Sequence, residues 1–278
     1  MKKVLCLLFA CILCSALVFT ACSNKEPEES EEPAEEVTEE TESPDLTKMM
    51  IGKWSIQERD GKPAPTNQKA ILTLVTPEKA YISASFSELG STDWENSHEM
   101  DVVIDRDKVT LTRKVNKHTT LVDEVTASEI TDSEVNGNLV VKKIKDGTEE
   151  TLIDQSIKMV RVNEDYSKDI IGTWEGHRTS EEGDYDDGED HRWEYKDDGT
   201  YVYYAKENGQ WTAVEQKIND YFVDGDLLLT RWENNGKEAD ELWEIKISGD
   251  KMNWTATRYN DKDQTMYTAS FEMTRVNG

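Results

Sequence analysis

Cysteine is missing from almost the whole of this sequence. All four cysteines lie within the first 22 residues, at Cys6, Cys11, Cys14 and Cys22. The first three fall inside a predicted signal peptide, and Cys22 lies at its end. The remaining chain has no thiol and no disulfide framework, so we expect a hydrophobic core alone to stabilise its folded part.

Basic residues are also scarce. The sequence has 32 lysines and arginines against 58 acidic residues, a formal net charge of −26. Residues 23–47 carry 11 acids and one base, residues 48–163 carry 19 acids and 16 bases, and residues 164–278 carry 28 acids and 13 bases. Binding to nucleic acid depends on clustered basic residues that displace counterions, so this charge excludes a nucleic-acid partner.

Sequence signatures of catalysis are absent as well. The chain contains no HExxH helix, no phosphate-binding P-loop, no nucleophile elbow and no glycine-rich dinucleotide fingerprint. Carboxylate pairs are so numerous that they do not indicate a glycosidase. We therefore expect a protein that is not an enzyme and needs no cofactor.

Residues 1–22 have the pattern of a bacterial export signal. Lys2 and Lys3 precede an apolar run over residues 4–19, which is shorter than the ~20 residues of a membrane span. The run ends in Phe19-Thr20-Ala21-Cys22, which resembles the lipobox of bacterial lipoproteins. The resemblance implies cleavage before Cys22, lipidation of Cys22 and anchoring to a membrane; an uncleaved anchor is the alternative.

Residues 23–47 form an acidic linker rich in Glu, Pro, Ser and Thr. Such a composition cannot bury enough apolar surface to fold, so we predict a disordered tether. An acidic run after a lipidated cysteine also resembles the surface-export signals of some Bacteroidetes lipoproteins, and a plain spacer is the equal alternative. We expect an outer-membrane-anchored protein of the cell envelope, facing the periplasm or exposed at the surface.

The rest of the chain contains a duplication. Ile51-Gly52-Lys53-Trp54 recurs as Ile171-Gly172-Thr173-Trp174, and the closing phrase of residues 159–163 recurs at residues 273–277. Between them, residues 109–113 match residues 227–231 in the same order. Three matches in one order predict two tandem domains, at residues 48–163 and 168–278.

Both repeats have the alternating pattern of β-strands, with no amphipathic helical stripe. Asp-Gly and Asn-Gly pairs between the strands predict tight hairpins, as at Asn208-Gly209. The predicted strands of the first repeat are 51–59, 69–76, 79–87, 94–104, 108–116, 119–130, 134–145 and 149–162. Those of the second are 171–179, 189–196, 200–206, 211–223, 226–234, 238–247, 251–259 and 264–276. Eight hairpin-linked strands per repeat predict an all-β fold of two tandem, eight-stranded, up-and-down antiparallel barrels.

A Gly-x-Trp on the first strand and an Arg on the last strand of an eight-stranded repeat resemble the lipocalin (calycin) barrels. Together with the lipobox they resemble the lipocalin-like lipoproteins of Bacteroidetes. The resemblance implies that Trp54 packs against Arg161 and Trp174 against Arg275, as structural pairs at the closed end of each barrel. A guanidinium over an indole face stabilises by roughly 0.5–2 kcal/mol.

Two groups of residues in the second repeat suit metal ligands. The acidic loop over residues 181–190 would suit calcium, but its spacing does not match an EF-hand, and a solvated loop is the favoured interpretation. His177 and His191 flank this loop. Strand alternation turns them to opposite faces, so we predict no metal site there.

The aromatic residues are concentrated in the second repeat. Six of eight tryptophans and nine of ten tyrosines lie in residues 164–278. Alternation directs one set into the second barrel, and we predict that it binds a small apolar or amphipathic ligand: Trp193, Tyr195, Trp243, Trp254, Tyr267 and Phe271. The corresponding set of the first barrel resembles ordinary core: Ile82, Ala84, Phe86, Ile153, Ile157 and Met159. The alternative is that both barrels are filled and the protein is a cell-surface module that contacts proteins or glycans.

Overall fold

Antiparallel β-strands make up nearly all of the folded chain. The structure, a computed structural model, describes residues 45–83, 98–180, 190–234, 236–260 and 265–276. The helices among them are the single turns α1 (Leu46–Met49) and η1 (Thr66–Gln68), and none is long and apolar enough to cross a membrane. The all-β prediction is confirmed. The predicted signal peptide with Cys22 and the tether up to residue 44 lie outside the described residues.

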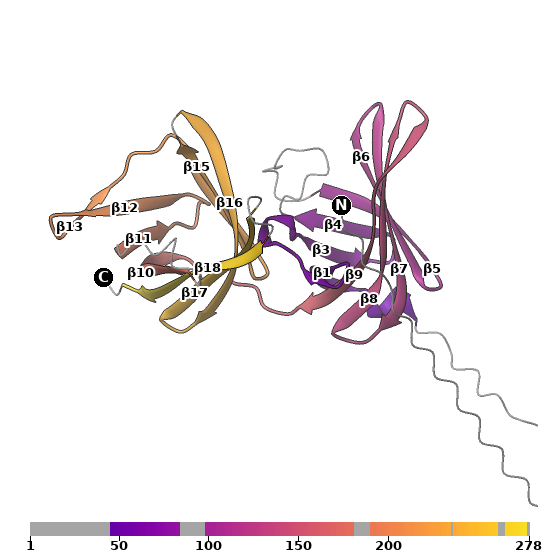
Figure 1. The fold of residues 1–278 in the computed structure, drawn as a ribbon, viewed down its shortest axis with the longest axis horizontal. Helices are drawn as coiled ribbons and strands as arrows, with labels where there is room; N and C mark the ends of the chain where they lie inside the picture. Colours follow the sequence, from indigo (N-terminus) through magenta and orange to yellow (C-terminus); the bar gives the residue numbers. More distant parts are fainter. Residues whose placement is uncertain (1–44, 84–97, 181–189, 235, 261–264, 277–278) are drawn as a thin grey trace, which may run out of the picture. The chain divides into compact units, whose positions relative to one another are not determined.

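The first repeat closes on itself (Figure 1). Its strands follow the predicted ranges closely, with two residues of β2 added beside β1: β1 (Gly52–Arg59), β2 (Lys62–Pro63), β3 (Ile71–Thr76), β4 (Lys79–Ser83), β5 (His98–Asp105), β6 (Lys108–Asn116), β7 (Thr119–Ile130), β8 (Glu134–Lys145) and β9 (Thr148–Val162). From β3 to β9 each strand pairs with the next along the chain, and β1 pairs with both β2 and β3. β1 also pairs with β9, with Trp54 opposite Arg161. This closure removes both open edges of an eight-stranded barrel.

The second repeat has the same order of strands but forms a half-barrel. Its strands are β10 (Gly172–Ser180), β11 (Asp190–Tyr195), β12 (Tyr201–Glu207), β13 (Gln210–Ala213), β14 (Asn219–Asp224), β15 (Leu227–Asn234), β16 (Lys237–Ser248), β17 (Lys251–Asn260) and β18 (Thr265–Arg275). The first and last strands, β10 and β18, pair as β1 and β9 do, with Trp174 opposite Arg275. The sheet runs from β13 through β10 and β18 to β14.

The opening of the half-barrel lies where the sequence predicts one strand over residues 211–223. That segment is broken into β13 and β14 by residues 214–218. The amide of Val214 still donates to the carbonyl of Tyr203 in β12 (2.9 Å). Thr200, just before β12, forms an isolated bridge with Asp220 of β14. Extra residues inserted in one strand interrupt the ladder and bend the strand. The interruption therefore explains why this sheet stays open where the first one closes.

Turn chemistry sets the hairpins as predicted. Asn208 and Gly209 both have positive φ, at 50° and 80°, and Asp146 and Gly147 adopt the same pair of conformations at 50° and 82°. Two successive residues with positive φ form the type I′ turn, whose twist matches that of the flanking strands. These two turns fix the register of β12 with β13 and of β8 with β9.

In one of the three internal sequence matches, the matched residues point to different faces of their sheets. Leu111 of β6 lines the interior of the first barrel, whereas its sequence match Leu229 lies in a separate cluster outside the second interior. Leu228 instead belongs to the second core. A shift of one residue turns every side chain of a strand to the other face. The match of residues 109–113 to 227–231 is thus wrong by one residue as a structural alignment.

The Gly-x-Trp phrase and the distant arginine form the same unit in each repeat. The guanidinium carbon of Arg161 lies 4.2 Å from the ring centroid of Trp54, and that of Arg275 lies 4.1 Å from Trp174. Each indole donates to a carbonyl four residues earlier, Met50 at 2.8 Å and Ile170 at 2.7 Å. Both tryptophans are fully buried.

The glycine of the phrase makes room for that arginine. Gly52 has φ of 125° and Gly172 has φ of 128°, a region that other residues rarely adopt. A Cβ on Gly52 would lie 2.4 Å from the Arg161 guanidinium, and one on Gly172 would lie 2.6 Å from that of Arg275. The arginine also donates to carbonyls just before the glycine, at 2.7 Å from Ile51 and Ile171. Glycine, tryptophan and arginine therefore recur together because they form one contact.

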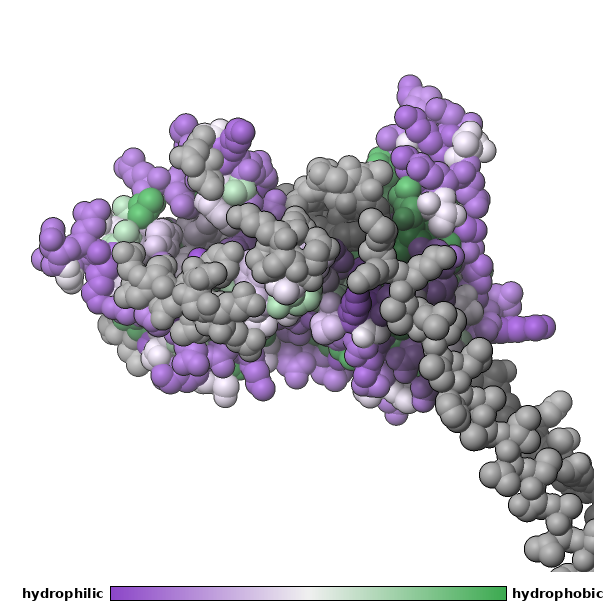
Figure 2. Space-filling view, viewed as in Figure 1, coloured by the Kyte–Doolittle hydropathy of each residue, from purple (hydrophilic) through white to green (hydrophobic). Residues whose placement is uncertain are grey.

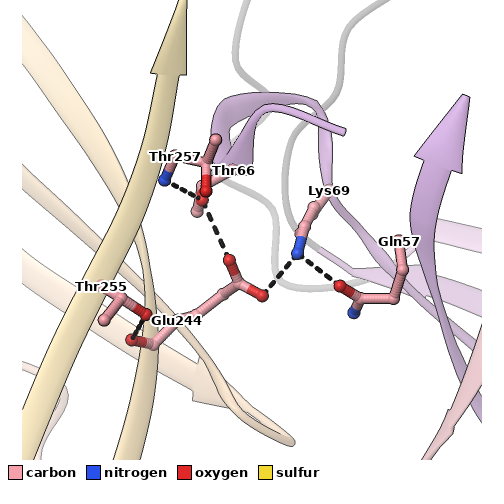
Figure 3. A network of polar contacts seen from close by, with 6 residues as sticks. All are labelled: Gln57, Thr66, Lys69, Glu244, Thr255 and Thr257. Carbon is pink, nitrogen blue, oxygen red and sulfur yellow. Dashed lines mark hydrogen bonds and ion pairs between the residues drawn. The ribbon is translucent and has the colours of Figure 1, made fainter. Parts of the chain in front are cut away.

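The outer face of β15 is apolar because the first repeat covers part of it. A cluster of buried side chains joins the repeats: Ile71, Val162, Leu227, Leu229 and Leu242. Beside it, Figure 3 shows Lys69 donating to Gln57 (2.7 Å) and to Glu244, while Thr66 donates to the other oxygen of Glu244 at 3.0 Å. Lys69 is only 5% exposed. Elsewhere the described surface in Figure 2 is mostly hydrophilic, with small hydrophobic patches.

Candidate ligand-binding site

The interior of the second sheet contains a pocket of about 240 Å³. Its walls come from seven strands and from the break between β13 and β14. They are formed by Arg178, His191, Trp193, Tyr201, Tyr203, Gln216, Thr230, Trp232, Glu241, Trp243, Trp254 and Phe271. The interior cavity of the first barrel measures about 60 Å³ and is lined mainly by aliphatic side chains. The two interiors therefore differ both in size and in chemistry.

Four rings form the centre of the pocket wall. Trp254 lies 4.9 Å from Trp193, 5.5 Å from Trp243 and 5.3 Å from Phe271, measured between ring centroids. Trp193 and Phe271 meet edge to face at 5.2 Å. Tilted and edge-to-face contacts are the favoured geometries of aromatic pairs. The rings support one another and hold a defined surface.

These four rings belong to the set predicted from alternation, and the other two members lie elsewhere. Tyr195 is buried beneath the pocket, against Tyr221 (4.8 Å) and Tyr201 (6.0 Å). Tyr267 of β18 lies opposite Arg258 of β17 and does not line the pocket. In the first barrel, Ile82, Ile153, Ile157 and Met159 line the small cavity as predicted core residues, whereas Ala84 and Phe86 lie outside the described residues.

Several pocket residues were missed by the sequence analysis. Tyr201 and Tyr203 share one face of β12, and Trp232 shares a face of β15 with Leu228. Alternation predicts that Tyr201 and Tyr203 share a face. It also predicts that Trp232 faces inward once Leu228, rather than Leu229, is taken as the inward residue of β15. Gln216 could not be found this way, because it lies in the break between β13 and β14.

Trp254 carries the most informative polar atom of the site. The residue is 3% exposed, and its Nε1 is buried with no hydrogen-bond partner among the described residues. A buried N–H without a partner costs about 1–3 kcal/mol. Buried indoles usually find an acceptor. An acceptor from a bound molecule would satisfy this donor.

The charged groups of the pocket have partners of their own. Arg258 donates to Glu241 at 2.8 Å, and the Trp243 indole donates to the other carboxylate oxygen at 3.2 Å. The guanidinium carbon of Arg258 also lies 5.0 Å from the ring centroid of Trp243. The guanidinium carbon of Arg178 lies 5.7 Å from the ring centroid of Phe271. Two ring faces therefore already hold cations supplied by the protein.

Three phenols in or near the pocket, those of Tyr195, Tyr201 and Tyr221, are neutral. Burial raises the pKa of Tyr195 well above its ordinary value and that of Tyr201 in the same direction, and it raises the pKa of Tyr221 to about 12. Tyr203 shares a hydrogen bond with His191 Nδ1 at 2.9 Å. The raised pKa values keep the Tyr195, Tyr201 and Tyr221 hydroxyls protonated at neutral pH, so these three cannot serve as ionised bases.

The described residues do not bring metal ligands together. Among the described residues, no three His, Cys, Asp or Glu side chains are arranged to hold a metal ion. His177 pairs in register with Asp190, whereas His191 is buried in the pocket wall. Residues 181–189 of the acidic loop lie outside the described residues, so the calcium alternative stays a prediction.

Comparisons with known proteins identify no family. No protein-family model matches the sequence, and no curated protein matches it. One similar solved structure is a protein of unknown function from the DUF3598 family of Nostoc punctiforme, with a TM-score of 0.22 and 14% identity, covering 83% of this chain and 98% of that chain. Another is a variant of the vaccine antigen transferrin binding protein B from Haemophilus parasuis, with a TM-score of 0.22 and 7% identity, covering 76% of this chain and 61% of that chain. Likenesses this weak carry no argument about the site.

Proposed function

We propose that the second repeat binds a small amphipathic molecule in its 240 Å³ pocket, without catalysing a reaction. The observation that supports this most is Trp254, whose buried Nε1 has no partner among the described residues and which lines the pocket. Ligand sites are concave, largely apolar and furnished with a few polar groups that orient the ligand. The aromatic wall supplies the apolar surface, and Trp254 supplies an orienting donor.

The first repeat has a supporting role in this proposal. Its interior cavity of about 60 Å³ is too small for a ligand of several rings, since a cavity of ~150 Å³ is known to hold one benzene. The buried contacts of Lys69 and of the apolar cluster attach the second repeat to this filled barrel. The first barrel thus acts as a base for the binding domain.

The pocket can be tested by filling it. Thr230 lines the pocket and is buried, so Thr230→Phe places a ring in the space where the ligand would sit. Small molecules released from purified wild-type protein by denaturation would be identified by mass spectrometry. We expect a compound that co-purifies with wild type and with Trp211→Phe but is lost from Thr230→Phe. Identical extracts from all three proteins would favour a filled structural barrel that contacts proteins or glycans.

We propose further that Cys22 is lipidated and anchors the protein in the cell envelope through the acidic tether. The support is the sequence Phe19-Thr20-Ala21-Cys22 and the composition of residues 23–47. Cys22→Ala should lose the lipid mass and should move from the detergent phase to the aqueous phase. A variant that still carries lipid and partitions like wild type would contradict the anchor.

A further inference from the structure

The tryptophans of this protein differ in whether their indole N–H has a hydrogen-bond partner, and the difference indicates a class of ligand for the pocket. We infer that the ligand is a flat compound of one or two fused rings whose polar atoms are hydrogen-bond acceptors, such as ring nitrogens or carbonyl oxygens. The inference rests on the proposed function, because it concerns the same pocket. Pocket size, wall geometry and unused donors each support it.

Volume sets the size of the molecule. The pocket measures about 240 Å³, which exceeds the ~150 Å³ cavity that holds benzene and lies below the ~300–1,000 Å³ of sites for drug-sized ligands. One ring leaves space and two fused rings fill it. A porphyrin or a sterol is too large to be enclosed.

The wall favours a flat molecule. Trp193, Trp243, Trp254 and Phe271 present ring faces and edges, and the measured centroid distances among them run from 4.9 to 5.5 Å. Aromatic pairs in tilted or edge geometry are stabilised beyond the burial of their area. A planar ring finds such partners here, whereas a flexible chain would lose conformational entropy without gaining them.

The described tryptophans outside this pocket all have an acceptor for their indole N–H. Trp54 and Trp174 donate to backbone carbonyls at 2.8 Å and 2.7 Å. Trp211 donates to the Glu175 carboxylate at 3.0 Å. An indole N–H can donate but cannot accept, and buried indoles usually find a partner. The fold therefore satisfies these donors wherever the pocket is not involved.

Three of the four tryptophans that line the pocket have no such partner. The Nε1 atoms of Trp193, Trp232 and Trp254 make no hydrogen bond within the described part of the chain, whereas Trp243 donates to Glu241 at 3.2 Å. Among the described tryptophans, the unused donors thus all belong to the pocket wall. An acceptor on a ligand would satisfy such a donor, but a donor on a ligand would leave it unpaired.

Free acceptors are scarcer in the pocket wall than free donors. Most of the lining side-chain oxygens already take part in a hydrogen bond, namely those of Tyr201, Tyr203, Thr230 and Glu241. The remaining one belongs to the Gln216 amide, which makes no hydrogen bond within the described residues and also offers N–H donors. The balance of unpaired groups therefore favours a ligand that supplies acceptors.

Four uncharged probes of similar size test the two parts of the inference. Quinoline is flat and has an acceptor nitrogen, naphthalene has no polar atom, indole has an N–H donor, and trans-1-decalone has an acceptor oxygen on puckered rings. Isothermal titration calorimetry on the full chain at pH 7, with displacement of quinoline by the poorly soluble naphthalene, gives the affinities. We expect quinoline to bind tightest and each of the others about tenfold more weakly, since each lacks the acceptor or the flat rings.

Substitutions of the unpaired tryptophans identify the donor. Trp193→Phe, Trp232→Phe and Trp254→Phe each remove one N–H and keep an aromatic ring. At least one of them should lower the affinity for quinoline by about fivefold to tenfold and leave that for naphthalene within about twofold of wild type. Circular dichroism would confirm that each variant is folded, and the three variants test the inference independently.

Trp243 supplies the matched control within the same wall. Its N–H is already bound by Glu241, so Trp243→Phe should change the affinities for quinoline and naphthalene by the same factor. Equal or tighter binding of naphthalene, indole or trans-1-decalone, or an unchanged preference for quinoline in all three test variants, would overturn the inference. Failure of every probe to bind would also overturn it. A compound that co-purifies with wild type and is lost from Thr230→Phe would still support the proposed function in each of these cases.

Discussion

The two repeats have the same order of strands and the same tryptophan–arginine unit, but their interiors differ. The first closes through β1 and β9 around aliphatic side chains and keeps a cavity of about 60 Å³. The second is interrupted between β13 and β14, is lined with aromatic rings and holds a pocket of about 240 Å³. The first repeat is a packed barrel because its strands pair continuously. The second repeat is hollow because one of its strands is broken.

The shared unit should matter equally to both repeats. Trp54→Ala and Trp174→Ala each remove a fully buried indole from its arginine, so each should lower the free energy of unfolding by about 3–5 kcal/mol. Urea unfolding followed by circular dichroism measures both losses. If one substitution costs less than about 1 kcal/mol, the two tryptophan–arginine units do not stabilise their repeats equally, and the prediction is wrong.

The contact between the repeats should depend on one buried lysine. Lys69→Ala leaves Glu244 without its cation, and we expect a loss of about 2–3 kcal/mol, below the 3–5 kcal/mol of a fully buried pair because Glu244 keeps 22% of its side chain exposed. The control is Lys53→Ala, which breaks the more exposed pair with Asp224 and should cost under about 1 kcal/mol. Similar losses for both variants would show that the burial of Lys69 has no special effect.

Adding volume should distinguish the filled barrel from the hollow one. Leu139→Phe enlarges a buried side chain beside the small cavity and should destabilise by about 1–3 kcal/mol. Thr230→Leu adds volume to the wall of the large pocket and should cost under about 1 kcal/mol. Thermal unfolding of the two variants provides the measurement. A larger loss for Thr230→Leu would mean that the second interior is as tightly packed as the first.

Asp226, beside the contact between the repeats, should make stability depend on pH. Burial, with the nearby Glu244 carboxylate, raises its pKa from 3.8 to about 6. The folded protein then holds this proton more tightly than the unfolded chain, so the contribution of Asp226 falls as pH rises from about 4 to about 6. Asp226→Asn should therefore stabilise by about 1–2 kcal/mol at pH 7 and have little effect at pH 4.

Urea unfolding of wild type and Asp226→Asn at both pH values measures this difference. A stabilisation of the same size at pH 4 and pH 7 would assign the effect to side-chain packing rather than to ionisation. Loss of stability at pH 7 would show that the Asp226 carboxylate is needed in its charged form.

Short-range sequence signals predicted most of the strands. Pairs such as Asn208-Gly209 fix a hairpin through backbone conformation alone, and their effect does not depend on distant contacts. Strand alternation placed Trp193, Trp243, Trp254 and Phe271 on one inner wall, because side chains of a strand alternate between its faces. It also placed Tyr195 and Tyr267 on that wall, where neither lines the pocket, since alternation gives a face but not a depth.

Packing, rather than the sequence similarity of β15 to β6, determines which side chains of β15 face the core. The sequence aligns Leu229 with Leu111, yet Leu229 faces the first repeat and Leu228 faces the core. An outer face covered by another domain is apolar, so both faces of β15 carry leucine and alternation gives no clear phase. Only the contact with Ile71 and Val162 shows which leucines are outside.

The sequence by itself determined the duplication, the positions of nearly all strands and the inner face of the aromatic strands, because each of these follows from local periodicity and turn chemistry. Tertiary structure alone decided that the first sheet closes and the second stays open, and that the second therefore keeps a pocket. Closure depends on the pairing of strands far apart in the chain, such as β1 with β9, and on whether the strand is broken, as it is at residues 214–218. The break between β13 and β14 leaves no clear mark in the alternation of the sequence.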